Sequence, residues 1–472
     1  MANRISKSVG TNGKLSSGGK FREISTTGLD HSSGYIREEF LRVLQGERGR
    51  KIYREMADNS PIVGGLLLAI QMLIRKVEWR VDVSLIGEDL GKSDTELEDA
   101  RKWLDGVLFH DQEDSWDDII MEVLSCLTYG WAYFETTFKL RLGMHQNSIE
   151  RRSIYDDGKI GVRRIKIRAQ DTLDKWEIDK NGTILGLWQQ IPNTSMRVFI
   201  PMEKSMLFRP SLYKGNPEGR SILRNAYRPW YFGKKIEEIE AIGVERDLTG
   251  LPVVRIPNEL LAADDAASQA VVAKYVQLAR DIRLNSEGGV VIASDPFIND
   301  DGSYTSAPAI DVTLLSTSGT RVINTVDVVN RYDTRIALSV LADFLLLGLS
   351  GKGSSGSFAL SKEKTNMFID SVSGWLEMIA TPFNKKLIPQ LWEFNNFDPH
   401  TQPVLTAGRL QPVDLAVLGE YVQKLSGAGM PLFPDSDLNE YLRRVSGLPQ
   451  STGESVFEED EMKEEELVEV EE

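Results

Sequence analysis

The chain is almost without cysteine and histidine. Its 472 residues include a single cysteine, Cys126, and 4 histidines, which are His31, His110, His145 and His400. One cysteine cannot form an intrachain disulfide, so a disulfide-stapled secreted scaffold is excluded. Cys126 lies in an apolar run, and we interpret it as a buried core residue. The histidines lack the spacing of metal ligands, so we expect no metal site and no cofactor.

Long apolar runs are absent as well. The most apolar stretch, Pro61–Ile74, is shorter than the roughly 20 residues that a membrane-spanning helix needs. The first residues, MANRISKSVGTNGKLSSGG, lack the apolar segment of a signal peptide. We therefore expect a protein of the cytoplasm without a membrane partner. In it, Pro61–Ile74 is a buried helix that Asn59 or Ser60 caps.

Positive charge is scarce. The chain has 55 lysines and arginines against 70 acids, a net charge of −15. The segment Glu454–Glu472 holds 11 acids and one lysine, and removing its −10 from −15 leaves −5 for the rest. We predict that this tail is solvated and disordered. The mildly acidic remainder does not favour tight binding of nucleic acid.

The glycine- and serine-rich stretch Gly348–Ser357 has the composition of a phosphate-binding loop but not its pattern. A P-loop ends in Gly-Lys followed by Ser or Thr, between a strand and a helix. Here Gly353 follows Lys352, Leu346 occupies the position of the first glycine, and a predicted helix precedes the loop. A second near match, Gly87–Gly91, is one residue too short. No Gly-x-Ser-x-Gly elbow is present either, so we expect no enzyme.

One basic run could contact nucleic acid. Arg151–Ala169 carries seven cations and two acids. On a strand, neighbouring residues such as Arg163 and Arg164 point to opposite faces, which splits the charge. We interpret the run as salt bridges between subunits or as a solvated hairpin, and contact with nucleic acid remains the less favoured alternative.

Periodicity in the first half of the chain predicts an α+β fold. Helical periodicity begins near Ile36 and gives two helices followed by a strand, Glu78–Val83. Two more amphipathic helices follow, and the second opens with Ser115 and Asp118 as a capping box. From residue 131 to 208 short segments predict strands, with Asn181-Gly182 as a hairpin turn.

Long helices dominate the second half. Ser221–Asp247 is helical with an interruption at Pro229, and Val322–Leu347 is a second long helix. Between them, residues 251–320 predict a small α/β unit, so we expect an insert held on a stalk of two helices. A third long helix, Leu360–Asn395, is followed by two short ones, Val413–Leu425 and Asp437–Val445.

Four stretches, in this order, resemble the portal proteins of tailed bacteriophages. YREMADNSPIVGGLLLAIQMLIRKVEWRV resembles the N-terminal helix-helix-strand of that family, and GRSILRNAYRPWYFGKKIEEIEAIGVERDLTGLPVVRIP resembles its first stem helix. LSVLADFLLLGLSGKGSSGSFALSKEKTNMF resembles the end of the second stem helix, the tunnel loop and the next helix. LIPQLWEFNNFDPHTQPVLTAG, with LGEYVQKLSGAGMPL and LRRVSGLPQ, resembles the closing wing and crown segments. The likeness covers about residues 36–450.

The resemblance implies a ring, usually a dodecamer, at the unique vertex of the capsid in the virion, assembled in the host cytoplasm. It implies a channel for double-stranded DNA during genome packaging and ejection, and contacts with the terminase large subunit, the head-tail adaptor and the major capsid protein. It divides the chain into a disordered N-terminal arm (1–34), wing (35–220), first stem helix (221–250), clip (251–320), second stem helix (321–347), tunnel loop (348–357), second part of the wing (358–409), crown (410–450) and acidic disordered tail (451–472).

The resemblance also implies two sets of DNA-channel residues. The tunnel-loop set is Ser350, Gly351, Lys352, Gly353, Ser354, Ser355, Gly356 and Ser357, and the stem candidates are Lys234, Lys235, Asp327 and Arg331. One lysine per loop would give weak, interchangeable phosphate contacts, because tight contacts would stall sliding DNA. Two alternatives stay open: a soluble nucleotide-dependent enzyme that uses the Gly/Ser loop, and a non-viral ring scaffold.

Overall fold

The structure is a computed structural model that describes residues 25–84, 93–249, 251–283, 296–298, 302–308, 310–315, 325–340, 357–410 and 415–427, with isolated residues up to 443. The chain divides into two compact units. Unit one comprises Met1–Ala69, Met121–Thr137 and Ile165–Phe368, and unit two comprises Ile70–Ile120, Phe138–Arg164 and Ile369–Glu472.

Unit one begins with a small hairpin, β1 (His31–Ser32) and β2 (Tyr35–Ile36). Its turn residue Gly34 has φ +87°, and a Cβ there would lie 2.0 Å from the carbonyl oxygen of Trp176. Trp176 N donates to Gly34 O at 3.0 Å. This corrects the disordered arm predicted for residues 1–34 at its end, because a contact distant in sequence orders the turn. Residues 1–24 lie outside the described residues.

Two helices follow as predicted, α1 (Gly46–Asn59) and α2 (Pro61–Arg75), but the first begins at Gly46 and not near Ile36, which ends strand β2. One face of α2 is buried, including Val63 and Ile70, while Leu68 and Met72 are exposed. Within the described residues no single helix is long and apolar enough to cross a membrane. Helices α1 and α2 reach that length and composition only together, and the chain bends by 85° between them.

The strands of unit one form antiparallel sheets around an aromatic core. The strands β6 (Leu173–Ile178), β7 (Ile184–Gln190) and β8 (Arg197–Pro201) pair in this order. Asp179 N donates to Thr183 O at 2.9 Å across the predicted Asn181-Gly182 turn, which is confirmed. The buried side chains of this core are Trp131, Tyr133, Leu173, Trp176, Leu187 and Ile200. A second sheet has the order β5 (Ile160–Arg168), β4 (Ala132–Leu140), β9 (Ser205–Phe208).

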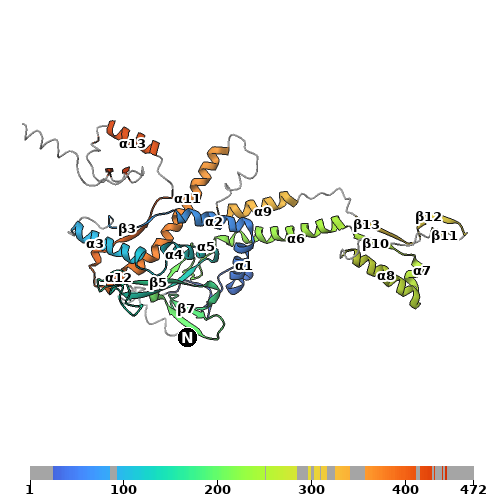
Figure 1. Cartoon of the computed structure of the whole chain (residues 1–472), viewed down its shortest axis with the longest axis horizontal. Coiled ribbons are helices and arrows are strands. Elements are labelled where there is room, and N and C mark those ends of the chain that lie inside the picture. The colour runs from blue at the N-terminus through green and yellow to red at the C-terminus, as the bar shows by residue number, and fades with distance from the viewer. Residues whose placement is uncertain are drawn as a thin grey trace, which may run out of the picture. The chain divides into compact units, whose positions relative to one another are not determined.

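Two long helices lie side by side, α6 (Tyr227–Thr249) and α9 (Thr325–Ser339) (Figure 1). A 3-10 turn, Ile222–Arg224, precedes α6. The predicted interruption at Pro229 is wrong. Proline is the third residue of α6, and the first turn of a helix tolerates a missing N–H.

The chain between α6 and α9 pairs with itself. Strand β10 (Leu251–Arg255) follows α6 and is antiparallel to β13 (Asp311–Leu315). Between them come the helices α7 (Asn258–Ala262) and α8 (Ala266–Arg283) and a hairpin, β11 (Pro296–Ile298) with β12 (Tyr304–Pro308). The hairpin was not predicted, and the predicted strand Val290–Ala293 lies outside the described residues.

Unit two combines helices with a strand pair of distant sequence positions. Strand β3 (Trp79–Asp82) pairs antiparallel with β14 (Val404–Ala407). Helix α3 (Asp94–Asp105) continues into a π-helical turn, η4 (Gly106–His110). Helix α11 (Ser357–Pro382), a second π-helical turn, η8 (Phe383–Leu387), and α12 (Ile388–Phe394) follow one another without a loop. Asn384 Nδ2 donates to Leu405 O at 2.9 Å, and Leu405 N donates to Asn384 Oδ1 at 2.8 Å.

The remaining described helices are α4 (Trp116–Val123), α5 (Ser125–Tyr129) and α13 (Leu415–Gly427). The predicted capping box is confirmed, because Ser115 Oγ lies 2.6 Å from Asp118 Oδ2 and accepts from Asp118 N at 3.1 Å. Most of the predicted helix Asp437–Val445 lies outside the described residues. The mixed α+β fold class is confirmed.

Candidate functional site

The candidate stem residues lie on the helix pair α6 and α9. The rings of Phe232 and Tyr332 stack across the pair, with centroids 6.4 Å apart and planes at 28°. Near the other end, Thr325 Oγ1 donates to Glu240. Gly233 faces Tyr332 across the pair, and a Cβ at this glycine would lie 3.6 Å from Tyr332 Cβ, an ordinary van der Waals contact.

Both lysine candidates on α6 have partners within the chain. Lys234 forms an ion pair with Glu55 of α1, and its Nζ lies 5.6 Å from the ring centroid of Trp230. Lys235 Nζ lies 2.6 Å from Glu238 Oε2, and this hydrogen bond raises the pKa of Lys235 and lowers that of Glu238. The acidic partners offset part of the positive charge of the two lysines. Because both side chains are exposed, they can still attract an anion in the solvent, although more weakly than unpaired lysines would.

The candidates on α9 differ from each other in their surroundings. Arg331 is exposed, and its guanidinium lies 5.2 Å from the ring centroid of Tyr332. Asp327 is exposed in the first turn of the helix. Nearby, loss of hydration and the charge of Glu237 raise the pKa of Asp333. The helix pair therefore holds two acids close together, one from each helix.

The same helices expose large apolar side chains. Ile239 is 67% exposed, Val326 59% and Leu338 56%. Single exposed apolar residues are ordinary on soluble proteins, but several along one helix pair give a surface suited to packing against another molecule. The helix pair combines such a surface with partly neutralised charge.

The tunnel-loop candidates lie largely outside the described residues. This holds for Ser350, Gly351, Lys352, Gly353, Ser354, Ser355 and Gly356. Ser357 is the first residue of α11. The second near match to a nucleotide loop, Gly87–Gly91, also falls outside.

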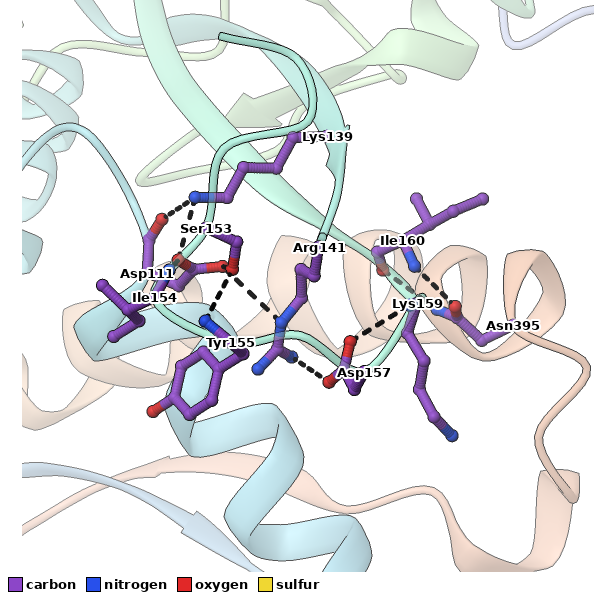
Figure 2. A network of polar contacts seen from close by, with 10 residues as sticks. All are labelled: Asp111, Lys139, Arg141, Ser153, Ile154, Tyr155, Asp157, Lys159, Ile160 and Asn395. Carbon is purple, nitrogen blue, oxygen red and sulfur yellow. Dashed lines mark hydrogen bonds and ion pairs between the residues drawn. The ribbon is translucent and has the colours of Figure 1, made fainter. Parts of the chain in front are cut away.

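A network of buried charges organises unit two (Figure 2). Asp111 is buried and follows the π-helical turn η4. Its carboxylate accepts from Ser153 Oγ at 2.8 Å and from Ile154 N at 3.1 Å. Lys139 Nζ lies 2.9 Å from the same carboxylate. Sequence reasoning missed this network, because its members are far apart in the chain.

The network continues through Arg141, which is 1% exposed. Its guanidinium pairs with Asp157 at 3.3 Å and lies 4.1 Å from the ring centroid of Tyr155. Loss of hydration lowers the pKa of Arg141, and the charges of Asp157 and Asp111 oppose that shift. Asn395 closes the arrangement, since Ile160 N donates to its Oδ1 at 2.7 Å. Two cations and two anions thus fix the connection between β4 and β5, which is a structural role.

Several cations of the basic run are paired within the chain. Arg163 Nε lies 2.8 Å and Arg164 Nε 3.0 Å from the carboxylate of Glu113. Arg168 Nε donates to Glu135 at 3.0 Å. This pairing leaves less charge for a phosphate backbone than the sequence count indicated.

Neither a metal cluster nor a reactive thiol marks an enzymatic centre in the part of the chain that the structure describes. Within it, no group of three or more His, Cys, Asp or Glu side chains could hold a metal ion. Cys126 is buried, as predicted, and burial raises the pKa of its thiol. A thiol held in its neutral form is a poor nucleophile.

The comparisons with known proteins match most of the chain. A family model described as the portal protein of Mu bacteriophage matches residues 50–447. A comparison with curated proteins gives no match. Among solved structures, the neck of an empty GTA particle computed with C6 symmetry is 13% identical, covers 85% of this chain and 94% of that chain, and has a TM-score of 0.47. The virion of a native gene transfer agent particle is 11% identical, covers 87% and 95%, and has a TM-score of 0.46. An HK97 family phage portal protein from Corynebacterium diphtheriae is 11% identical, covers 78% and 96%, and has a TM-score of 0.39.

Proposed function

The chain belongs to the family of the Mu bacteriophage portal protein and acts as a portal at the capsid vertex, and we propose that its copies form a ring whose channel passes double-stranded DNA. The ring has the twelve-fold form usual for the family. DNA enters through it during packaging and leaves through it during ejection. Its role is structural and includes no enzymatic step, and it assembles in the host cytoplasm before residing in the virion.

The main support for the proposed ring is the exposed apolar surface of the α6 and α9 pair. Ile239, Val326 and Leu338 are each more than half exposed. Leu68 and Met72 add exposed apolar area on α2, at 51% and 57%. Burial of such surface is the dominant favourable term in association, so neighbouring copies packed along these helices would be stabilised. A heterologous contact repeated around an axis closes a ring.

The charge of the candidate channel residues fits passage rather than capture. Lys234 and Lys235 have acidic partners in the same chain. Each phosphate that a protein neutralises adds affinity, and such contacts do not depend on base sequence. Partly neutralised lysines, with Asp327 and Arg331 on the neighbouring helix, would therefore let DNA slide. The tunnel loop, residues 348–357, would add weak contacts from Lys352.

The insert between the two long helices supplies the docking surface in this proposal. As the clip, residues 251–320 would meet the terminase large subunit during packaging and the head-tail adaptor afterwards. Strand β10 pairs with β13 within the insert, so the insert can present a surface without unfolding the helices that carry it. The wing, residues 35–220 and 358–409, would meet the major capsid protein, and residues 410–450 would form the crown.

Electron microscopy and sedimentation of the purified chain test the proposal. We expect rings with an open axial channel, whereas a monomer at micromolar concentration across ordinary salt would overturn it. The enzyme alternative predicts that ATP with magnesium raises the Tm, because a ligand of the folded state stabilises it. A non-viral ring scaffold would form rings but would not be needed for filling capsids with DNA.

A further inference from the structure

One aromatic side chain of unit one is displayed rather than buried. Phe40 is 90% exposed, and its neighbour Val43 is 42% exposed. A phenyl ring that stays in water does not stabilise the fold by burial, which is the main stabilising contribution of such a side chain. Such a residue is informative when the backbone that carries it is held firmly in place.

The backbone on both sides of Phe40 is tied down. The Glu39 carboxylate forms a bidentate pair with Arg224, whose Nη2 donates to Oε1 at 2.6 Å and whose Nε donates to Oε2 at 2.8 Å. Gln45 Nε2 donates to Glu39 O at 2.6 Å. Leu44 is buried four residues after Phe40. Phe40 is therefore presented on a fixed segment, residues 37–45, which we call the Phe40 knob.

The charge that surrounds the knob is positive. Its two acids are neutralised, since Glu38 lies 2.7 Å from Lys214 and Glu39 pairs with Arg224. Arg37 and Arg42 are exposed, and neither side chain has an ion-pair partner among the described residues. The knob thus presents one aromatic ring with two available guanidinium groups.

Unit two contains a cleft whose shape and charge complement the Phe40 knob. It has a volume of about 440 Å³, which is within the range that takes a bulky side chain with its neighbours. Three aromatic rings lie in its wall. The centroid of Trp103 is 5.5 Å from that of Trp392 and 4.8 Å from that of Phe397. Ala100 leaves room beside them. We call this the aromatic cleft.

The rim of the aromatic cleft is acidic. Glu96 and Asp99 of α3 are exposed, and within the described part of the chain neither carboxylate has an ion-pair partner. Lys159 is the one cation that lines the cleft, and it lies 3.9 Å from the ring centroid of Phe397. The indole Nε1 of Trp103 is buried without a hydrogen-bond acceptor in the described structure. A buried donor without an acceptor is costly, so an incoming carbonyl group would relieve it.

We propose that the Phe40 knob of one copy inserts into the aromatic cleft of a second copy. Phe40 would pack edge-to-face against the wall of Trp103, Trp392 and Phe397, the arrangement that aromatic rings prefer. Arg37 and Arg42 would meet Glu96 and Asp99 at the rim. Knob and cleft are different surfaces of one chain, so the contact is heterologous and propagates around an axis. The inference rests on the proposed ring and assigns one contact within it.

Cross-linking tests the contact, because the chain lacks any competing thiol. Its only cysteine, Cys126, is buried. In the full-length double variant Val43→Cys/Ala100→Cys, a short bis-maleimide should join knob to cleft from copy to copy and give a ladder of covalent multimers. Each single variant should give no ladder. A double variant that forms rings without a ladder overturns the contact while the ring itself stands, and a monomeric wild type overturns both.

Substitutions supply an independent test. Phe40→Glu should weaken ring assembly about tenfold or more, as loss of a central aromatic anchor does. Met196→Glu is the matched control, since Met196 is also apolar and 64% exposed in unit one, and it should assemble normally. Arg42→Glu should weaken assembly, and Arg42→Glu/Asp99→Arg should restore it by reversing both charges. Equal assembly of Phe40→Glu and the control, or no rescue by the charge reversal, would contradict the proposal.

Discussion

Arg141 and Asp111 lie 3.6 Å apart, Nε to Oδ2, and each side chain is 2% exposed. Ion pairs at the surface contribute little to stability, but a buried pair is different. Removing one partner leaves a charge in a medium that cannot hydrate it. The pair belongs to a cluster that also contains Lys139, so two buried cations depend on Asp111.

We predict that Asp111→Ala lowers the free energy of unfolding by about 3–5 kcal/mol, the range for breaking a buried pair from one side. Denaturant unfolding followed by tryptophan fluorescence measures the change. Asp156→Ala is the control, because Asp156 is exposed in the same connection between β4 and β5, and it should change stability by less than about 0.5 kcal/mol. Similar losses in both variants would show that the cluster is not a stabilising unit.

The acid pair between the long helices predicts a pH dependence. Loss of hydration and the charge of Glu237 raise the pKa of Asp333, so the folded state binds this proton more tightly than the unfolded state. Stability from this group is therefore lost as pH rises from the ordinary aspartate range through the raised pKa. Asp333→Asn removes that loss, so its gain over the wild type should grow across this window and then stay constant. Thermal unfolding at a series of pH values measures it.

Glu237→Gln provides the second arm of this test. It removes the neighbouring charge but leaves Asp333 partly dehydrated, so it should reduce the pH dependence without abolishing it. A difference between Asp333→Asn and the wild type that shrinks as pH rises would contradict the sign of the effect.

The mixed fold was predictable from local signals, but its long-range pairings were not. Residues close together in the sequence determine the periodicity of α1, α2 and α3 and the turn at Asn181-Gly182. Strand β14 pairs with β3 across more than 300 residues of chain, and a four-residue strand carries no mark of its partner. The π-helical turns η4 and η8 escaped prediction for a related reason, since they depend on packing and not on propensity.

The candidate site was predictable only in part. The resemblance selected Lys234 and Lys235 on the predicted long helix Ser221–Asp247, and the structure has both lysines exposed on α6. The acidic partners of the two lysines differ in how far they lie from the lysine in the sequence. Glu238 is three residues from Lys235 and could be read from the sequence, whereas Glu55 reaches Lys234 from another helix. The network around Asp111 and the aromatic cleft arise from tertiary packing alone.

Variants of the Gly/Ser loop, residues 348–357, distinguish the portal function from the alternative of a nucleotide-dependent enzyme. In a channel, Lys352→Ala removes one weak contact per copy and should change DNA packaging modestly. Bulky residues at Gly353 and Gly356 should impair packaging more, because they stiffen the loop and narrow the passage. A nucleotide-binding loop predicts the reverse order, with Lys352→Ala abolishing activity. Packaging is measured beside ring assembly. If Lys352→Ala and the glycine variants all package normally, the loop does not line the channel.

Replacing residues 251–320 by a short Gly/Ser linker should leave ring formation intact and abolish the filling of capsids with DNA. The reason is that the described strands of this insert pair with one another, β10 with β13 and β11 with β12, so none is taken from the rest of unit one. Electron microscopy measures rings and a nuclease-protection assay measures packaged DNA. Filled capsids without the insert would rule it out as the docking site.

Truncation after Gly453 should leave assembly unchanged. The segment that this removes has 11 acids between Glu454 and Glu472 and cannot form a core. Sedimentation of the truncated and full-length chains gives the comparison. A truncated chain that stays monomeric would show that the acidic tail is part of the assembly.

The bonds between Asn384 and Leu405 have a consequence for a protein present in many copies. A two-stranded ribbon such as β3–β14 has open edges, and an open edge can recruit a strand from a neighbouring molecule. The Asn384 amide takes up both the N–H and the carbonyl of Leu405, in the manner of a partner strand one residue long. At this point the edge of β14 therefore has no free N–H or carbonyl at Leu405 to offer to a strand of a neighbouring copy.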